Sequence, residues 1–439
     1  MASPDENARF YNAYALSTGQ IFPRNSDGVL THRIPKAYVE FISEYNSRYS
    51  EKLGEKESFQ EMYYNSWLPA GTAESIDITY WTIDTNPVGS AIPAIGMTIF
   101  RVLGSCHQTV ANLLMAGKIA NLVVYIAICF YAIKAIPRYK RTLFLLALMP
   151  MTLYQAASIN YDAILFASCF ALASFVLSVL ERGDEQKISK RDILIVLGIT
   201  VVLSGVKQVY ACLLLLLFAI PINSFKSKKQ YISCICGVII TACIICIGQK
   251  VGIFLLGANA TAEETAMQQQ LHYIVTHPWR VPSIIWNSFI RNGSFYSVSF
   301  FGCLGQLDTN FPMPFILFQS ATMFFIVVCD WIESRSSSLK VSLYGLLGAA
   351  MSVVLSFVAV YVIWTSHKQG VGVDWVDGIQ GRYFIPVVPF VVISIPAVKR
   401  MKLREAVIER RESFDTFACV TGALNAAATF LILLLRFKV

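Results

Sequence analysis

Residues 109–141 read TVANLLMAGKIANLVVYIAICFYAIKAIPRYKR, a long apolar run that ends in a short basic segment. The same order recurs from there to residue 439, because apolar stretches alternate with polar connections and every second connection is rich in Lys and Arg. A helix needs about 20 predominantly apolar residues to cross the hydrocarbon core of a bilayer. The pattern therefore predicts an all-α polytopic membrane protein.

The composition supports this class. Hydrophobic residues make up 55% of the chain and charged residues 15%, whereas soluble globular domains contain about 25% charged residues. The net charge of +8 is concentrated in the connections, and no basic domain carries interleaved aromatic side chains. We therefore expect the lipid bilayer as a partner and exclude nucleic acid.

Ten apolar stretches are candidate transmembrane helices. They are 109–136, 143–157, 163–180, 193–206, 210–222, 231–256, 313–332, 341–364, 383–398 and 417–435. Two of them, 193–206 and 210–222, are short enough to form a re-entrant pair instead. We favour two crossings, because both outer flanks of this pair are basic and so belong on one side.

Lys and Arg next to membrane spans stay preferentially on the cytoplasmic side. The basic connections predicted to lie there are 138–141, 182–191, 226–229, 335–340 and 399–411. The chain then divides into a first extracytoplasmic loop, half of a transmembrane bundle, a second extracytoplasmic loop and the other half of the bundle. These parts cover residues 1–108, 109–256, 257–312 and 313–439.

The first polar region has no hydrophobic segment in front of it, so we expect a further transmembrane helix ahead of Met1. Residues 5–16 and 90–103 are patterned as amphipathic helices, which often lie in the membrane interface. Residues 36–56 are more polar, and we expect them to be solvated.

Five clusters on the predicted outer face carry residues capable of chemistry. They are Pro4-Asp5-Glu6, Asn160-Tyr161-Asp162, Lys207 to Tyr210, His277 to Arg280 with Gly302 to Asp308, and Gly378 to Phe384. Each has an ordinary structural alternative, such as a helix cap, a turn or a side chain anchored at the interface. Ionisable groups of opposite sign at helix ends on one face nevertheless predict a shared polar cavity.

Such a cavity suits transfer from a phosphate-linked donor. A carboxylate such as Asp5 can act as a general base toward an acceptor hydroxyl. Lys207 and Arg382 can hold a phosphate or pyrophosphate leaving group, and Arg can do so with two parallel hydrogen bonds. Gly378 and Gly381 allow backbone N–H groups to approach an anion closely.

The clusters, taken in chain order, resemble the DUF2142 family of bacterial membrane proteins. The resemblance extends over nearly the whole chain, and its most specific part is Gly-Ile-Gln-Gly-Arg-Tyr-Phe at residues 378–384, followed by Asn-Tyr-Asp-Ala at residues 160–163. That family is similar in turn to the GT-C membrane glycosyltransferases. The similarity implies a polyprenyl-phosphate sugar donor, an essential acid in the first outward loop, a cell-surface glycan acceptor and a location in the bacterial plasma membrane.

These considerations give each candidate residue an expected role. Asp5 is the expected catalytic base, and Glu6 is a second acid or metal ligand. Donor phosphate binding is expected of Lys207, Tyr210, Gln380 and Arg382. Positioning of the substrates is expected of Asn160, Asp162, His277 and Asp308.

Metal dependence and the reaction itself stay open at this stage. No His/Cys set has zinc spacing, but Asp5, Glu6 and Asp162 are candidate ligands for a hard divalent cation such as Mg or Mn. A transporter or flippase of lipid-linked saccharides is one alternative function, and a polymerase or ligase of lipid-linked glycans is another. Soluble nucleotide-binding enzymes and hydrolases are excluded, because the sequence has no phosphate loop, dinucleotide fingerprint or nucleophile elbow.

Overall fold

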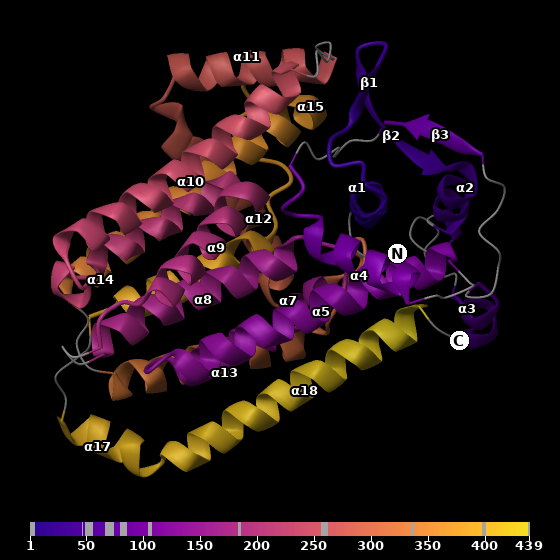
Figure 1. Ribbon diagram of the computed structural model, residues 1–439. Coiled ribbons are helices and arrows are strands. Elements are labelled where there is room, and N and C mark those ends of the chain that lie inside the picture. Colours follow the sequence, from indigo (N-terminus) through magenta and orange to yellow (C-terminus); the bar gives the residue numbers. More distant parts are fainter. Residues whose placement is uncertain are drawn as a thin grey trace.

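Helices form most of the structure, a computed structural model that describes residues 5–45, 47–48, 56–65, 74–79, 86–103, 108–182, 186–255, 262–334, 338–396 and 401–437. In Figure 1 the N-terminal helices α1–α3 and strands β1–β3 gather at one end of the helical bundle, and α17 lies at the opposite end. The chain therefore forms a bundle with a small mixed cap at one end.

Six helices of the described residues are long and apolar enough to cross a membrane. They are α5 (Val110–Ala135), α8 (Asp162–Glu181), α10 (Lys228–Leu255), α13 (Met313–Glu333), α14 (Leu339–Val360) and α18 (Arg411–Phe437). The prediction of an all-α membrane protein with several spans is confirmed, whereas a count of ten full-length helices is not.

The other four expected spans are shorter or broken. They are α6 (Lys140–Ala147) with α7 (Pro150–Ala156), α9 (Lys190–Val206), the 3₁₀ helix η2 (Gln208–Ala219), and the 3₁₀ helix η5 (Gly381–Val387) with α16 (Val388–Ser394). Pro150 separates α6 from α7 because proline lacks an N–H group and disfavours a helical residue before it. A 3₁₀ helix rises about 2.0 Å per residue, so the 12 residues of η2 still extend about 24 Å.

The N-terminal part contains a small sheet that the sequence pattern did not reveal. Its antiparallel strands β1 (Arg24–Ser26), β2 (Val29–Pro35) and β3 (Ser75–Ile78) lie in the order β1-β2-β3. Strands β4 (Cys303–Leu304) and β5 (Thr309–Asn310) form a separate hairpin. The other elements are α1 (Glu6–Ser17), α2 (Lys36–Tyr45), α3 (Phe59–Asn65), α4 (Ala91–Val102), η3 (Ile222–Ser224), α11 (Ala262–Thr276), α12 (Arg280–Phe301), η4 (Tyr361–Thr365), α15 (Ser366–Gln369) and α17 (Met401–Glu409).

The two amphipathic helices expected in the first loop are present as α1 and α4, and α4 packs along α5. A Cβ atom at Gly96 would lie 2.6 Å from both the carbonyl oxygen of Ala116 and the Cβ of Ala120, so only glycine permits this approach. Arg101 then ties α4 to the end of α1, because its guanidinium donates to the carbonyl and hydroxyl oxygens of Ser17 at 2.9 Å. These contacts fix the end of α1 relative to α4 and so to the bundle.

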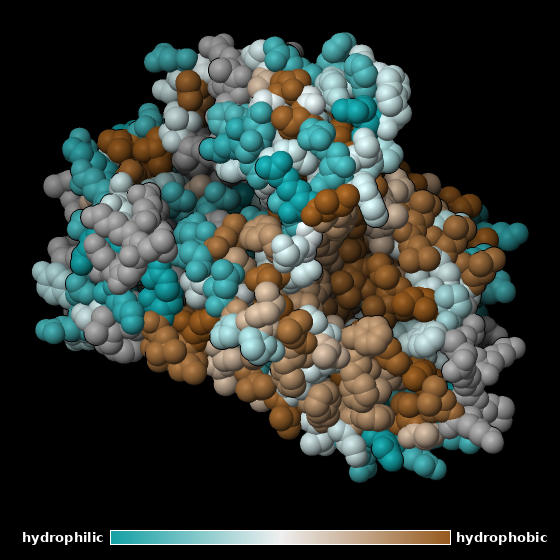
Figure 2. Space-filling view, turned by 180° about the vertical axis from the view of Figure 1, so that it is seen from behind, coloured by the Kyte–Doolittle hydropathy of each residue, from teal (hydrophilic) through white to brown (hydrophobic). Residues whose placement is uncertain are grey.

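Helix α8 is buried along most of its length, whereas α5, α10 and α18 expose apolar side chains. Figure 2 shows a broad hydrophobic surface over the helices that continues into a hollow, with hydrophilic residues toward the margins. Apolar side chains on the outside and a fully packed helix within are typical of a bundle surrounded by lipid.

Candidate functional site

The first residue of the buried helix α8, Asp162, is the centre of a charged cluster. Its side chain is 1% exposed. One carboxylate oxygen lies 2.7 Å from Nζ of Lys207, and the other lies 3.6 Å from Nε of Arg382. Lys207 ends α9 and Arg382 lies in the first turn of η5. Three helix ends that are far apart in the chain therefore meet at one carboxylate.

Close packing of η5 against α12 positions Arg382. A Cβ atom at residue 381 would collide with the backbone of Tyr296 and Phe300, so only glycine fits there. The N–H group of Gly381 also donates to Oγ of Ser299 at 2.8 Å. Glycine precedes Arg382 in the 378–384 motif because only glycine permits this close contact with α12, and the contact places the guanidinium of Arg382 beside Asp162.

Aromatic rings border the two cations. Nζ of Lys207 lies 5.1 Å from the ring centre of Tyr161 and 4.5 Å from that of Tyr383. The hydroxyl of Tyr210 donates to the carbonyl oxygen of Tyr383 at 2.8 Å, which holds that ring in place. On the other side, Arg9 lies 4.0 Å over the ring of Tyr161 and donates to its hydroxyl at 2.7 Å. Cation–π contacts of this kind stabilise positive charge where water is scarce.

The cluster has more hydrogen-bond donors than the protein uses. Arg382 is 6% exposed, yet its Nε and Nη1 atoms make no hydrogen bond within the described residues, although Nε faces Asp162 at 3.6 Å. The acceptor atom Oε1 of Gln380 also makes no hydrogen bond there. Burial disfavours the charge of Lys207, but the carboxylate of Asp162 outweighs this and raises the pKa of Lys207 overall. Buried polar groups are rarely left unpaired, so a buried guanidinium with unsatisfied donors beside a second cation favours an additional anion at this position.

Asp5, the expected base, lies at the same end of the bundle. It is exposed, immediately precedes α1 and adopts a left-handed backbone with φ of 60°, a conformation that Asp and Asn tolerate better than most residues. The next residue, Glu6, accepts the N–H of Ile159, which precedes Asp162 by three positions, at 2.9 Å. Pro4, the first residue of its motif, lies outside the described residues. Asp5 is therefore an accessible carboxylate near the cationic cluster.

Glu6 is engaged in a different contact. It is 1% exposed, accepts the N–H of Ile159 at 2.9 Å and pairs with Nζ of Lys118 at 3.1 Å. Burial alone would raise the pKa of Glu6, but Lys118 and the Ile159 hydrogen bond lower it to about 2. These contacts attach α1 to α5 and to the segment before α8. They hold Glu6 in the packing between α1 and α5, and its role as a second acid or metal ligand stays a prediction.

A shared metal site does not fit these residues. Within the described part of the chain, no three His, Cys, Asp or Glu side chains come close enough to hold one ion. Glu6 faces the ammonium group of Lys118, and Asp162 faces that of Lys207. Each expected carboxylate ligand except Asp5 is already paired with a cation of the protein.

Asn160 contacts Asp162 directly, whereas Asp308 lies in a hairpin that contacts α7. Oδ1 of Asn160 accepts the N–H of Asp162 at 3.2 Å, and its amide donates to Gln155 at 2.6 Å. Asp308, in the β4–β5 hairpin, accepts from Arg436 at 3.2 Å. Tyr154, in α7, donates its hydroxyl to the carbonyl oxygen of Gly305 in this hairpin at 3.2 Å. No sequence signal marks Tyr154, which lies inside an apolar run.

His277 lies elsewhere, at the exposed corner between α11 and α12. Its ring stacks on Tyr273 at 4.9 Å and meets the edge of Trp279 at 5.3 Å. Nδ1 lies 2.9 Å from the hydroxyl of Thr276. Within the described residues no contact joins His277 to Asp162, so the structure does not bring this candidate into the cluster.

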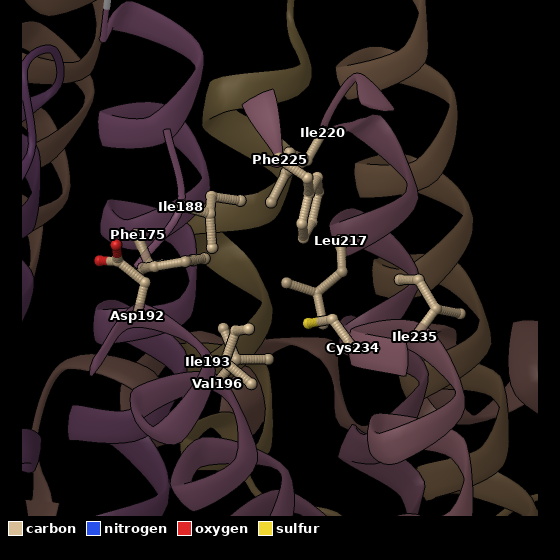
Figure 3. Close-up of a pocket in the computed structure, with 10 residues that line it drawn as sticks. All are labelled: Phe175, Ile188, Asp192, Ile193, Val196, Leu217, Ile220, Phe225, Cys234 and Ile235. Atoms are coloured by element: carbon tan, nitrogen blue, oxygen red, sulfur yellow. The ribbon is translucent and has the colours of Figure 1, made fainter. Parts of the chain in front are cut away.

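A narrow apolar pocket between α8, α9, η2 and α10 is a separate feature (Figure 3). Its volume of about 10 Å³ is near the minimum for one water molecule. Its one charged lining residue, Asp192, points its carboxylate away from the pocket, caps α9 together with Ser189 and pairs with Arg182 at 3.1 Å. This pocket has no features of a ligand site.

The comparisons with known proteins agree with a membrane bundle. No curated protein and no solved structure matches the chain. The family described as "Predicted membrane protein (DUF2142)" matches residues 1–391. Because this match spans most of the 439 residues, the chain belongs to the DUF2142 family of multi-pass membrane proteins.

Proposed function

We propose that the protein is a membrane glycosyltransferase that takes a sugar from a polyprenyl-phosphate donor and passes it to a cell-surface glycan on the extracytoplasmic face. The observation that carries this proposal is the buried carboxylate of Asp162 shared by Lys207 and Arg382, with donor atoms of Arg382 that make no hydrogen bond within the described residues. A site with surplus buried positive charge suits a phosphate-bearing substrate.

In this proposal Arg382 and Lys207 hold the phosphate of the donor. As the bond between the sugar and the phosphate breaks, negative charge grows on the departing phosphate oxygen. Preorganised cations beside that oxygen stabilise the transition state more than the ground state. Asp162 keeps both cations in position, which makes it a positioning residue.

Asp5 acts as the general base. It removes the proton from an acceptor hydroxyl, the hydroxyl oxygen attacks the anomeric carbon, and polyprenyl phosphate leaves from the opposite side with inversion. Asp5 suits this role because it is exposed, whereas Glu6 and Asp162 are buried and paired with cations. A positioned base contributes about 10²- to 10⁴-fold in rate.

The position of the cluster favours transfer over transport. Transporters usually bind their substrate near the bilayer midplane, at interrupted helices. Here Asp162 begins α8, and Lys207 directly follows α9, so the charged groups lie at helix ends. A polymerase or ligase would use the same base and phosphate clamp, and it differs in taking a lipid-linked chain instead of a single sugar.

The proposal is tested with Asp5→Asn and with Asp27→Asn as a matched control. Asp27 is also exposed and also left-handed, with φ of 54°, but it lies in the β1–β2 turn. We expect Asp5→Asn to lower the transfer of radiolabel from polyprenyl-phosphate hexoses to membrane glycan by about 10²-fold or more. Asp27→Asn should retain wild-type transfer. Equal transfer by both variants would remove Asp5 as the base.

A further inference from the structure

A second charged cavity lies at the other end of the bundle, between α6, α13, α17 and α18. Its volume is about 960 Å³. Its lining includes Arg138, Arg141, Asp330, Glu333, Arg404 and Asp415. Helix α8 separates it from the Asp162 cluster, because Asp162 begins this helix and the lining residue Glu181 ends it. The cavity therefore belongs to a different site.

All four carboxylates of the cavity are already paired. Arg141, which is 6% exposed, lies 2.9 Å from Asp415 and 3.3 Å from Asp330, and it also pairs with Glu333. Asp330 accepts two further hydrogen bonds, from the N–H and hydroxyl groups of Thr142, both at 2.8 Å. The fourth carboxylate, Glu181, pairs with Arg138. No carboxylate is left to attract a cation.

The cations of the cavity keep unused donors. Arg404 donates through Nε to the carbonyl of Glu333 at 3.3 Å, and no other partner of its guanidinium lies within the described residues. Arg411 approaches Glu333 at 3.4 Å while 58% of its side chain stays exposed. Lys140 has no polar partner in the described part of the chain, and Nη1 of Arg141 makes no hydrogen bond there. The side-chain donors that lack a partner in the described lining therefore suit an anion.

We propose that this cavity binds the phosphate of an anionic phospholipid headgroup. A lipid is favoured over a free anion because apolar side chains continue the lining beside the cations, namely Ile133, Phe144 and Ile408. Helix α17 places exposed Leu403 and Ile408 next to Arg404, the pattern of a helix that lies on a membrane surface. Basic pockets between helices on the cytoplasmic side commonly bind anionic headgroups, and the basic connections predict that side for this cavity.

The test uses the full-length protein, purified in detergent and stripped of lipid. Phosphatidylglycerol, phosphatidylcholine or inorganic phosphate is added, and bound ligand is counted by native mass spectrometry. We expect phosphatidylglycerol to be retained most strongly. Arg404→Gln and Arg411→Gln should each weaken its retention about fivefold, because a basic side chain contributes about that factor near an anionic lipid.

Arg410→Gln is the control, since it removes the same charge from an exposed neighbour that does not line the cavity. Equal losses for Arg404→Gln, Arg411→Gln and Arg410→Gln would overturn the proposal and indicate surface attraction alone. Binding of inorganic phosphate as strong as that of phosphatidylglycerol would overturn the lipid assignment. Arg141 is not suitable for this test, because Asp330, Glu333 and Asp415 would lose their shared cation.

Discussion

The two ends of the bundle carry opposite arrangements of buried charge. At one end a single carboxylate, Asp162, is shared by two cations, and spare donors remain inside the cluster. At the other end a single cation, Arg141, is shared by three carboxylates, and most spare donors lie on surrounding residues such as Arg404. The first arrangement leaves donor atoms of Arg382 without a hydrogen bond within the described residues. The second is a cluster between helices in which every carboxylate is paired. We call it a closed joint, and further cationic side chains surround it.

The largest expected effect is the loss of that joint. Arg141→Gln would leave the carboxylates of Asp330, Glu333 and Asp415 without their shared cation. Removing one partner of a buried ion pair costs about 3–5 kcal/mol, and we expect a loss in that range in the free energy of unfolding. Arg182→Gln is the comparison, because its pair with Asp192 is partly exposed and should contribute about 1 kcal/mol or less.

Chemical denaturation in detergent, followed by tryptophan fluorescence, measures both variants. Similar small losses for Arg141→Gln and Arg182→Gln would show that the three carboxylates find other partners. The distinction between a closed joint and an open site would then fail.

The second largest expected effect is on the pH dependence of stability, to which Glu6 contributes beside the Asp162 cluster. Because the folded pKa of Glu6, about 2, is below its ordinary value of 4.5, the charged form stabilises the folded state above pH 4.5. This contribution, on the order of 3 kcal/mol, is lost as the pH falls from 4.5 toward 2. Glu6→Gln should be less stable at neutral pH and should lose less stability over this range.

Thermal unfolding measured between pH 6 and 2 tests this expectation. Glu74→Gln is the matched control, because Glu74 pairs with Lys36 at 3.6 Å on the surface and should keep the wild-type pH profile. His32 adds an earlier step, since burial lowers its pKa from 6.5 to about 4 and stability therefore falls as the pH drops from 6.5 to 4. A Glu6→Gln profile identical to that of the wild type would show that the Lys118 contact is not stabilising.

Much of this arrangement could be predicted from the sequence, because it follows from helix ends and charge alternation. The apolar runs predicted the long helices. The alternation of basic and less basic connections placed Asp162, Lys207 and Arg382 on one face. Lys118, a charge inside an apolar run, was a signal that a buried acid lies nearby. Its partner could not be named, because Glu6 lies more than a hundred residues earlier.

Other features depend on contacts that no local pattern records. Arg9 reaches Tyr161 across 152 positions of the chain, and Arg141 reaches Glu333 across 192. The pairing of His32 with Ile78 forms a sheet from short, irregular segments. The break at Pro150 was visible in the sequence, but an apolar run on both sides of the proline also suits a single kinked helix.

The smallest expected effect on stability comes from Arg382→Gln, and it is the sharpest test of the comparison. Asp162 keeps Lys207 at 2.7 Å, and the variant removes a buried donor that has no hydrogen bond. Losing the ion pair with Asp162 lowers the stability, whereas removing a buried donor without a hydrogen bond raises it. These effects oppose each other, so we expect the free energy of unfolding to change by about 1 kcal/mol or less. Binding of polyprenyl phosphate in detergent micelles should nevertheless weaken about tenfold or more, because a charge-assisted contact is lost. A large loss of stability with unchanged binding would mean that Arg382, like Arg141, belongs to a closed joint.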